Sequence, residues 1–215
     1  MPELPEVEST RRGLLAAMEG VRIDHAVVRE RRMRQPISRA LPACVEGLTV
    51  RALHRRAKYL LIDCGSGTLI VHLGMSGRMT LYDAKAAAEH PFERHDHVVF
   101  ELDDGWQVRF NDARRFGLML LTPTDSVEKH KAFKGLGPEP LDDAFDGAIL
   151  ADRLKGRRTP IKAALLDQKT LVGVGNIYAC EALYISGISP RRSAHTVQGD
   201  RADRLVAAIK QVLLS

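Results

Sequence analysis

The change in hydrophobic spacing along the chain is the feature that most constrains its fold. Up to Gly20, apolar residues such as Val7, Leu14 and Met18 recur at helical intervals, which predicts one amphipathic helix. From Val21 onward the pattern changes to short β-type runs, several of them separated by turn residues. The runs cover residues 23–28, 48–53, 59–63, 68–73, 97–102, 107–110 and 117–121. Such runs predict an antiparallel sandwich or barrel, and we expect a two-layer β-sandwich.

The last third of the chain has a helical pattern. Residues 122–146 are rich in proline and glycine, which indicates a domain boundary in this region. Beyond it, three stretches of helical apolar spacing predict helices between residues 161 and 213. We therefore expect an α+β protein with an N-terminal helix and sandwich domain at residues 1–130, followed by a helical domain at residues 131–215.

The composition is that of a globular protein, with 45% hydrophobic and 27% charged residues in a chain of 215. No stretch approaches the ~20 apolar residues that a membrane helix needs. The N-terminus is acidic and contains prolines, unlike a signal peptide, so we expect a cytoplasmic protein. Cys44, Cys64 and Cys180 show no C-x-x-C spacing, so we expect neither a zinc site nor any other cofactor in this chain.

The net charge of +5 suits a polyanionic partner without demanding one. The basic residues gather in short clusters at residues 11–12, 29–34, 51–58, 114–115, 155–158 and 191–192. Clusters of this kind form either a nucleic-acid-binding surface or ordinary solvated faces, and charge alone does not decide between the two.

Pro2 has an unusual catalytic capacity if Met1 is removed, because its secondary amine is then free. Such an amine attacks an electrophilic carbon, and with an aldehyde-level centre it forms an iminium that serves as an electron sink. The alternative is structural. Pro2 and Pro5 both suit the first turn of a helix, where the missing N–H costs nothing.

Glu3 and Glu6 follow this amine closely in the sequence. A carboxylate beside an amine can transfer protons to a leaving group or to a ring oxygen, and a second one three residues later can lie on the same side of a helix. The alternative is that both are favoured near a helix N-terminus by the helix dipole. The two residues alone leave both interpretations open.

Six segments together resemble the motifs of the formamidopyrimidine-DNA glycosylases, in that family's order. They are MPELPEVE at residues 1–8, RRAKYL at 55–60, HLGMSG at 72–77, DARRFG at 112–117, LGPEPL at 136–141 and VGVGNIYA at 172–179. The set spans most of the chain and is far more specific than any one short motif. The resemblance implies that the helical domain contains a helix-two-turn-helix element that binds DNA.

The resemblance also implies catalytic roles. Pro2 is implied to be the nucleophile at the sugar C1′ of the damaged nucleotide, and Glu3 the acid/base that assists opening of the sugar ring. Lys58 is implied to be a third catalytic residue, and Glu6 a supporting polar member of the pocket. For Lys58, the alternative is a lysine that guards the edge of a sheet against pairing with another chain.

DNA-binding roles are implied for six further residues. Met75, Arg114 and Phe116 resemble the residues that fill the double helix when the damaged base is extruded, although core packing and surface charge are the alternatives. Asn176 is implied to hold a phosphate together with the N-terminal amides of its helix. The remaining two implied DNA contacts are Lys162, whose alternative is a solvated helix lysine, and His95.

The activity implied by the resemblance is that of a bifunctional glycosylase and AP lyase of base excision repair. It excises oxidised purines, chiefly 8-oxoguanine and formamidopyrimidines, from double-stranded DNA and nicks the strand by β,δ-elimination. An endonuclease VIII-type enzyme for oxidised pyrimidines and a non-catalytic damage-binding fragment are the alternatives. We expect a monomer, truncated before the family's four-cysteine zinc finger, whose own activity the sequence leaves open.

Overall fold

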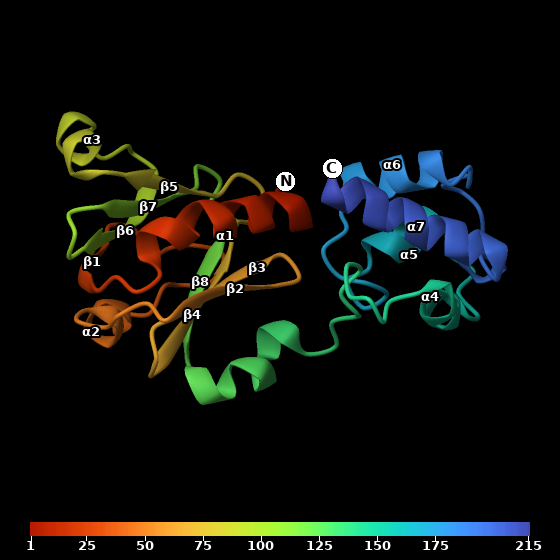
Figure 1. The fold of residues 1–215 in the computed structure, drawn as a ribbon, viewed down its shortest axis with the longest axis horizontal. Coiled ribbons are helices and arrows are strands. Elements are labelled where there is room, and N and C mark those ends of the chain that lie inside the picture. The colour runs from red at the N-terminus through yellow and green to blue at the C-terminus, as the bar shows by residue number, and fades with distance from the viewer. The chain divides into compact units, whose positions relative to one another are not determined.

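The computed structural model describes every residue from Met1 to Ser215. Contacts within the chain define two compact units. The sandwich unit comprises Met1–Pro2 and Glu6–Ala132, and the helical unit comprises Glu3–Pro5 and Phe133–Ser215. Each unit has its own hydrophobic core. Figure 1 shows the sandwich unit in red to green and most of the helical unit in green to blue.

Helix α1 (Leu4–Met18) is the first regular element. Val7, Leu14 and Met18 lie on one face of it and are buried in the core of the sandwich unit, as their spacing predicts. Gly20 follows with a φ of +82°. Glycine adopts this left-handed conformation without steric cost, which explains why the helix ends here.

Two antiparallel four-stranded sheets make up most of the sandwich unit, in the orders β1-β6-β7-β5 and β2-β3-β4-β8. The strands are β1 (Ile23–Val28), β2 (Ala52–Arg56), β3 (Tyr59–Asp63), β4 (Gly67–His72), β5 (Arg78–Tyr82), β6 (Asp96–Leu102), β7 (Gln107–Asn111) and β8 (Leu118–Pro123). One core contains residues of both sheets and of α1, among them Ile62, Phe100 and Phe110. The structure thus confirms the predicted α+β class and the two-layer antiparallel sandwich.

The sandwich unit and its connection to the helical unit also contain four short helical segments. They are α2 (Leu41–Val45), α3 (Ala84–Glu89), η1 (Thr124–Lys129) and η2 (Lys131–Phe133). The side chain of Asp83 caps α3 by accepting a hydrogen bond from the amide of Ala86. None of these segments was predicted from the sequence.

The strand predicted at residues 48–53 is wrong over most of its length. Val50 is fully buried, yet its backbone bonds to two residues of the chain that follows α1 rather than to a strand ladder. The amide of Gly20 donates to the Val50 carbonyl, and the Val50 amide donates to the carbonyl of Val21. The regular strand β2 begins only at Ala52, and before it Thr49 forms an isolated antiparallel bridge with Arg22, so the first part of the apolar run is paired only irregularly.

The helical unit contains α4 (Gly147–Leu154), α5 (Ile161–Leu166), α6 (Asn176–Ile185), η3 (Ala194–Thr196) and α7 (Asp200–Leu214). Leu205, Ile209 and Val212 form the buried face of α7, at the spacing that predicts an amphipathic helix. Leu4, from the far end of the sequence, belongs to this core and is 1% exposed. None of the helices combines the length and apolar composition that a membrane crossing requires.

Candidate functional site

The carboxylate of Glu3 is held at the N-terminus of helix α6. Its Oε2 accepts hydrogen bonds from the amides of Gly175 at 2.7 Å and Tyr178 at 3.4 Å, and its Oε1 accepts one from the amide of Ile177 at 3.0 Å. The first amides of a helix have no partner within the helix, and the helix dipole favours a negative charge there. The side chain is 1% exposed, so this carboxylate is fixed in one place.

The backbone around this contact has no spare room. A Cβ atom on Gly175 would lie 2.5 Å from Oε1 of Glu3, and one on Gly173 would lie 2.8 Å from Cβ of Leu4. The amide of Leu4 also donates to the carbonyl of Gly173 at 3.0 Å. The glycines of the VGVG segment therefore allow the N-terminal residues to approach the backbone that precedes α6.

The amides expected to hold a phosphate at this helix have another partner. Those of Gly175, Ile177 and Tyr178 donate to Glu3. The expectation of a phosphate on these three amides is therefore corrected, because each already has a carboxylate acceptor. Asn176 is exposed at the start of α6, so a phosphate contact at this position remains an expectation for its side chain.

Pro2 directly precedes Glu3 in the chain. It is partly buried, whereas Met1 is 54% exposed. With Met1 attached, the nitrogen of Pro2 is an amide and has no nucleophilic lone pair. Because Met1 is exposed, a peptidase can reach it, and its removal converts the amide nitrogen into an amine one residue away from Glu3.

Lys58 and Glu6 belong to the sandwich unit. Lys58 lies in the two-residue turn between β2 and β3 and is only 8% exposed, which is unusual for a lysine at a hairpin tip. Its neighbour Ala57 has a φ of +54°, so the turn uses a conformation that glycine would adopt more readily. Glu6 is exposed in the first turn of α1, where the helix dipole favours a carboxylate.

The three proposed insertion residues lie on two loops of the sandwich unit and are all exposed. Met75 is 42% exposed and Phe116 is 45% exposed, which excludes the core-packing alternative for both. The guanidinium carbon of Arg114 lies 4.8 Å from the centre of the Phe116 ring, a cation–π distance. Arg115, between them, has a φ of +55°, a sparsely populated conformation for a residue with a side chain.

His72, at the end of β4, orients the loop that contains Met75. Its Nδ1 accepts a hydrogen bond from the amide of Gly74 at 2.9 Å, and its ring packs edge-on against Tyr59 at 4.9 Å. Burial, and secondarily the positive charges of Arg34 and Lys58, lowers the pKa of His72 to about 4. A neutral ring is the form that can accept at Nδ1.

His95 lines a polar cavity of about 420 Å³ on the sandwich unit. The basic side chains around it are Arg29, Arg32, Arg94, His95, His97 and Arg115. Glu30 neutralises part of this charge, because it contacts Arg32 at 3.0 Å and Arg115 at 3.6 Å. The hydrogen bonds from Arg32 lower the pKa of Glu30 to about 2.

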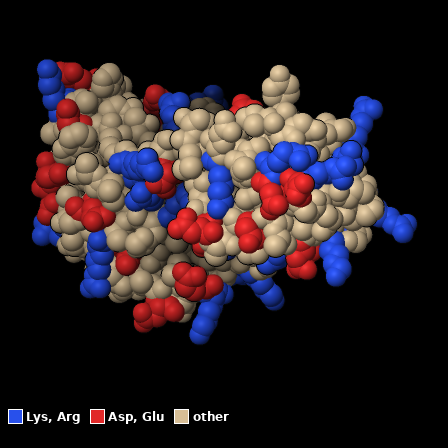
Figure 2. Space-filling view, turned by 45° about the vertical axis from the view of Figure 1, so that its right-hand side comes forward, with Lys and Arg blue, Asp and Glu red and all other residues tan.

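Other basic clusters are dispersed or ion-paired. Arg11 and Arg12 both contact Glu8, and the Arg11 hydrogen bond lowers the pKa of that carboxyl. Figure 2 shows Lys and Arg side chains interspersed with Asp and Glu over the face in view. For the cluster at residues 11–12, the ion pairs favour a solvated face.

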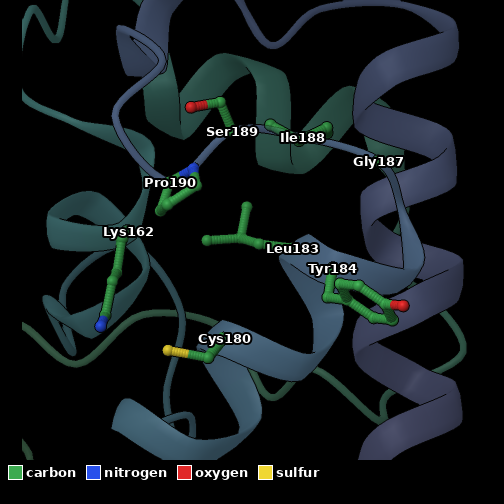
Figure 3. A pocket seen from close by; sticks show the side chains of 8 residues that line it. All are labelled: Lys162, Cys180, Leu183, Tyr184, Gly187, Ile188, Ser189 and Pro190. Carbon is green, nitrogen blue, oxygen red and sulfur yellow. The ribbon is translucent and has the colours of Figure 1, made fainter.

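Lys162 lies on α5 and lines a cavity of about 530 Å³ in the helical unit. The other lining residues are Cys180, Leu183, Tyr184, Gly187, Ile188, Ser189 and Pro190. Figure 3 shows the Lys162 ammonium directed away from the apolar side chains of this cavity. Lys162 is partly buried, and this direction is compatible both with a phosphate contact and with a solvated lysine.

The residues present do not form a metal site. Within residues 1–215 no group of three or more His, Cys, Asp or Glu side chains is placed to hold a metal ion. Cys44 and Cys180 are exposed and Cys64 is buried. These residues do not fit the zinc that the resemblance implies for its four-cysteine finger.

Sequence reasoning missed two features of the site. The acceptor role of Glu3 toward α6 has no local signal, because the bonded residues are 172 to 175 positions apart. Asp112 and Ser76 were recognised only as letters of two motifs, although their side chains are 2.6 Å apart. The one sequence signal for this contact was that Asp112 begins a turn that ends at Gly117, because aspartate side chains often accept hydrogen bonds in turns.

Comparison with known proteins gives a consistent result over both units. Residues 1–119 match the model of the formamidopyrimidine-DNA glycosylase N-terminal domain, and residues 136–215 match the model of the H2TH domain of the same enzymes. Formamidopyrimidine-DNA glycosylases from Cereibacter sphaeroides and Rhodopseudomonas palustris are 51% and 49% identical to this chain over 99% of its length, and 77% and 78% of the relatives' lengths are covered.

Solved structures agree. The Lactococcus lactis Fpg complex with DNA containing an abasic site has a TM-score of 0.90 at 31% identity, over 99% of this chain and 77% of the other. A MutM complex with DNA containing carbocyclic 8-oxo-G has a TM-score of 0.90 at 32% identity, over 99% and 78%. Both parts of the chain thus match one class of DNA-repair enzyme, the DNA glycosylases with an H2TH domain. The chain belongs to the formamidopyrimidine-DNA glycosylase family.

Proposed function

We propose that this chain excises oxidised purines, chiefly 8-oxoguanine and formamidopyrimidines, from double-stranded DNA and then cleaves the strand as an AP lyase. Membership of the family supports the glycosylase activity. The solved neighbours bound to DNA containing carbocyclic 8-oxo-G or an abasic site support the substrate class. The structural observation that carries the proposal is the immobile carboxylate of Glu3, covalently next to Pro2.

In the first step, the amine of Pro2 attacks C1′ of the damaged nucleotide. The bond between C1′ and the base nitrogen breaks, and the base leaves with the electron pair and takes up a proton. Glu3 accepts the proton that the amine of Pro2 loses and passes it to the ring oxygen as the bond between that oxygen and C1′ opens, which leaves an iminium joining Pro2 to the sugar. A carboxylate that could rotate away would serve this transfer less well than one that three amides hold.

In the next steps, the iminium withdraws electrons from the sugar. Loss of a proton from C2′ expels the 3′ phosphate, and a second elimination expels the 5′ phosphate. Hydrolysis of the iminium by water then returns the free amine of Pro2. In these steps the protein supplies an amine and carboxyl groups.

The remaining site residues support the reaction in this proposal. Lys58, in the turn between β2 and β3, binds a phosphate of the damaged strand. Glu6 is a polar side chain that lines the pocket for the damaged nucleotide. Met75, Arg114 and Phe116 fill the space that the extruded base leaves. Phosphate contacts are assigned to His95, Lys162 and the side chain of Asn176.

The proposal also includes the arrangement and location of the protein. Residues 1–130 form the catalytic domain and residues 131–215 the helix-two-turn-helix DNA-binding domain. The protein acts as a monomer, and because its substrate is chromosomal DNA we place it in the cytoplasm.

Borohydride trapping tests the proposal. Protein from which Met1 has been removed is incubated with duplex DNA containing 8-oxoguanine, and sodium borohydride is added to reduce the iminium to a stable amine. We expect a covalent adduct whose peptide map assigns the DNA to Pro2.

The matched control carries one extra residue before Pro2, and a second control carries one extra residue after Ser215. The first extension should abolish the adduct, because Pro2 is again an amide, whereas the second should leave it unchanged. An adduct of normal yield from the N-terminally extended protein would overturn the assignment of Pro2. A trapped adduct with oxidised pyrimidines but none with 8-oxoguanine would favour the endonuclease VIII-type alternative.

A further inference from the structure

The three proposed insertion residues come from two loops that are distant in sequence. Residues 73–77 connect β4 to β5 and contain Met75, and residues 112–117 connect β7 to β8 and contain Arg114 and Phe116. In the proposed function, the side chains of both loops enter the double helix at the same lesion. The distance between the loops is therefore a property on which the reaction depends.

Asp112 joins the two loops with its buried carboxylate. Its Oδ1 accepts a hydrogen bond from the hydroxyl of Ser76 at 2.6 Å, and its Oδ2 accepts one from the amide of Gly117 at 2.8 Å. Oδ1 also lies 3.3 Å from the amide of Arg114. The residue is 0% exposed, so water does not compete for these bonds.

The backbone of Asp112 is itself anchored to the neighbouring strand region. Its amide donates to the carbonyl of His95 at 3.0 Å, and its carbonyl lies 2.7 Å from Nε2 of the buried His97. The position of the carboxylate is thus fixed by contacts to His95 and to His97 of β6, outside the two loops.

The loops also touch directly at Gly74. Its φ is +66°, and a Cβ on this residue would lie 2.7 Å from the carbonyl oxygen of Phe116 and closer still to the amide of Gly117. Only a glycine allows this approach of the two backbones. Ser76 and Gly74 therefore hold the Met75 loop against the Phe116 loop from both sides of Met75.

We propose that Asp112, acting through Ser76, is a positioning residue that fixes the spacing between Met75 and the pair Arg114–Phe116, so that the three side chains enter DNA as one unit. The inference rests on the proposed function of those three residues. Asp112 itself touches no substrate in this proposal. It restricts the movement of the two loops before DNA binds, which lowers the entropy cost of ordering them in the complex.

The test uses Ser76→Ala, which removes the bond between the loops and leaves the contact between Asp112 and Gly117. The probe is a duplex containing 8-oxoguanine with 2-aminopurine beside it, whose fluorescence rises on unstacking. We expect unstacking and single-turnover excision both to slow about tenfold, while Ser76→Thr, which keeps the hydroxyl, restores both.

Thr68→Val is the matched control. Thr68 lies at the opposite end of β4, is buried, and shares a hydroxyl–hydroxyl hydrogen bond of 2.9 Å with Thr124. This variant loses a comparable bond in the same unit, so it should lower the melting temperature as Ser76→Ala does while unstacking stays normal. A second variant, Asp112→Asn, should slow unstacking if it folds, because one of its two oxygen acceptors is lost.

The outcomes separate the inference from the function on which it rests. If the parent protein neither excises 8-oxoguanine nor unstacks the probe, the proposed function is wrong. If the parent is active and Ser76→Ala unstacks the duplex at the parental rate, the positioning role is wrong while the function stands. Equal slowing in Thr68→Val would show that stability, and not loop spacing, controls the step.

Discussion

The amide of Gly175 donates a 2.7 Å hydrogen bond to the carboxylate of Glu3, 172 positions earlier in the chain. We expect Gly175→Ala to break this arrangement, because the new Cβ would lie 2.5 Å from Oε1 of Glu3. The free energy of unfolding should fall by about 2 kcal/mol, and excision should slow by more than tenfold. Urea unfolding and single-turnover excision measure the two effects.

The matched control for this variant is Gly13→Ala. Gly13 is exposed within α1, and nothing lies within 4 Å of the position of its Cβ. Alanine should therefore stabilise the helix by about 0.5–1 kcal/mol and leave excision unchanged. A Gly175→Ala protein as active and as stable as the parent would contradict the tight fit around Glu3.

Glu3→Gln should lose excision for two reasons. The amide side chain cannot transfer a proton, and its NH₂ group would face amides that are themselves donors. We expect excision to be abolished, binding of lesion-containing duplex to be kept, and the free energy of unfolding to fall by about 1–3 kcal/mol. Glu128→Gln, in the exposed η1 segment, is the control and should match the parent in all three measurements.

His72 should give the stability of the sandwich unit a specific pH dependence. Its folded pKa of about 4 lies below the ordinary value of 6.5, so the unfolded chain binds this proton more readily. The contribution to stability is therefore complete above about pH 6.5 and is lost as the pH falls toward about 4, by up to ~1.4 kcal/mol per pH unit.

His72→Asn isolates this effect, because its side-chain oxygen can still accept from Gly74 but does not titrate in this range. The free energy of unfolding of the variant should fall less steeply than that of the parent between pH 6.5 and 4. Between pH 7 and 8 the two curves should run parallel. Equal slopes over the acidic range would show that His72 is not held in its neutral form.

The three thiols should differ in reactivity. Burial raises the pKa of Cys64 to about 12, and this residue is 3% exposed, whereas Cys44 and Cys180 are exposed. A thiol reacts as its thiolate, so a disulfide reagent at pH 8 should modify two thiols in the folded protein and the third only in denaturant. Rapid reaction of all three thiols without denaturant would indicate that the core around Cys64 opens readily.

Much of the fold could be predicted because its signals are local. Strand β3 was predicted with its full bounds, since a continuous apolar run ends at a turn. Strand β5 was missed although Met79 and Leu81 alternate with polar residues, because it is short and none of its residues is fully buried. Helix α4 was missed because Asp146 and Gly147 are typical of a turn, whereas Asp146 in fact caps the helix by accepting from the amide of Ile149.

The chemistry of the candidate site could be predicted from motifs, but its geometry could not. The residues next to Glu3 in the sequence do not indicate that its carboxylate accepts hydrogen bonds at the N-terminus of α6 rather than of α1, which begins at Leu4. The contact between Ser76 and Asp112 likewise crosses 36 positions and depends on the register of two sheets. Contacts of this kind arise from tertiary packing, for which spacing along one segment contains no signal.

The assignment of Glu3–Pro5 to the helical unit has a consequence for the order in which the protein is assembled. A ribosome makes these residues first, yet the amides that bind Glu3 belong to Gly175, Ile177 and Tyr178. Residues Glu3–Pro5 therefore lack these partners until residue 178 has emerged from the ribosome and α6 has formed. A nascent chain whose sandwich unit has already folded therefore still lacks the amides that bind the Glu3 carboxylate.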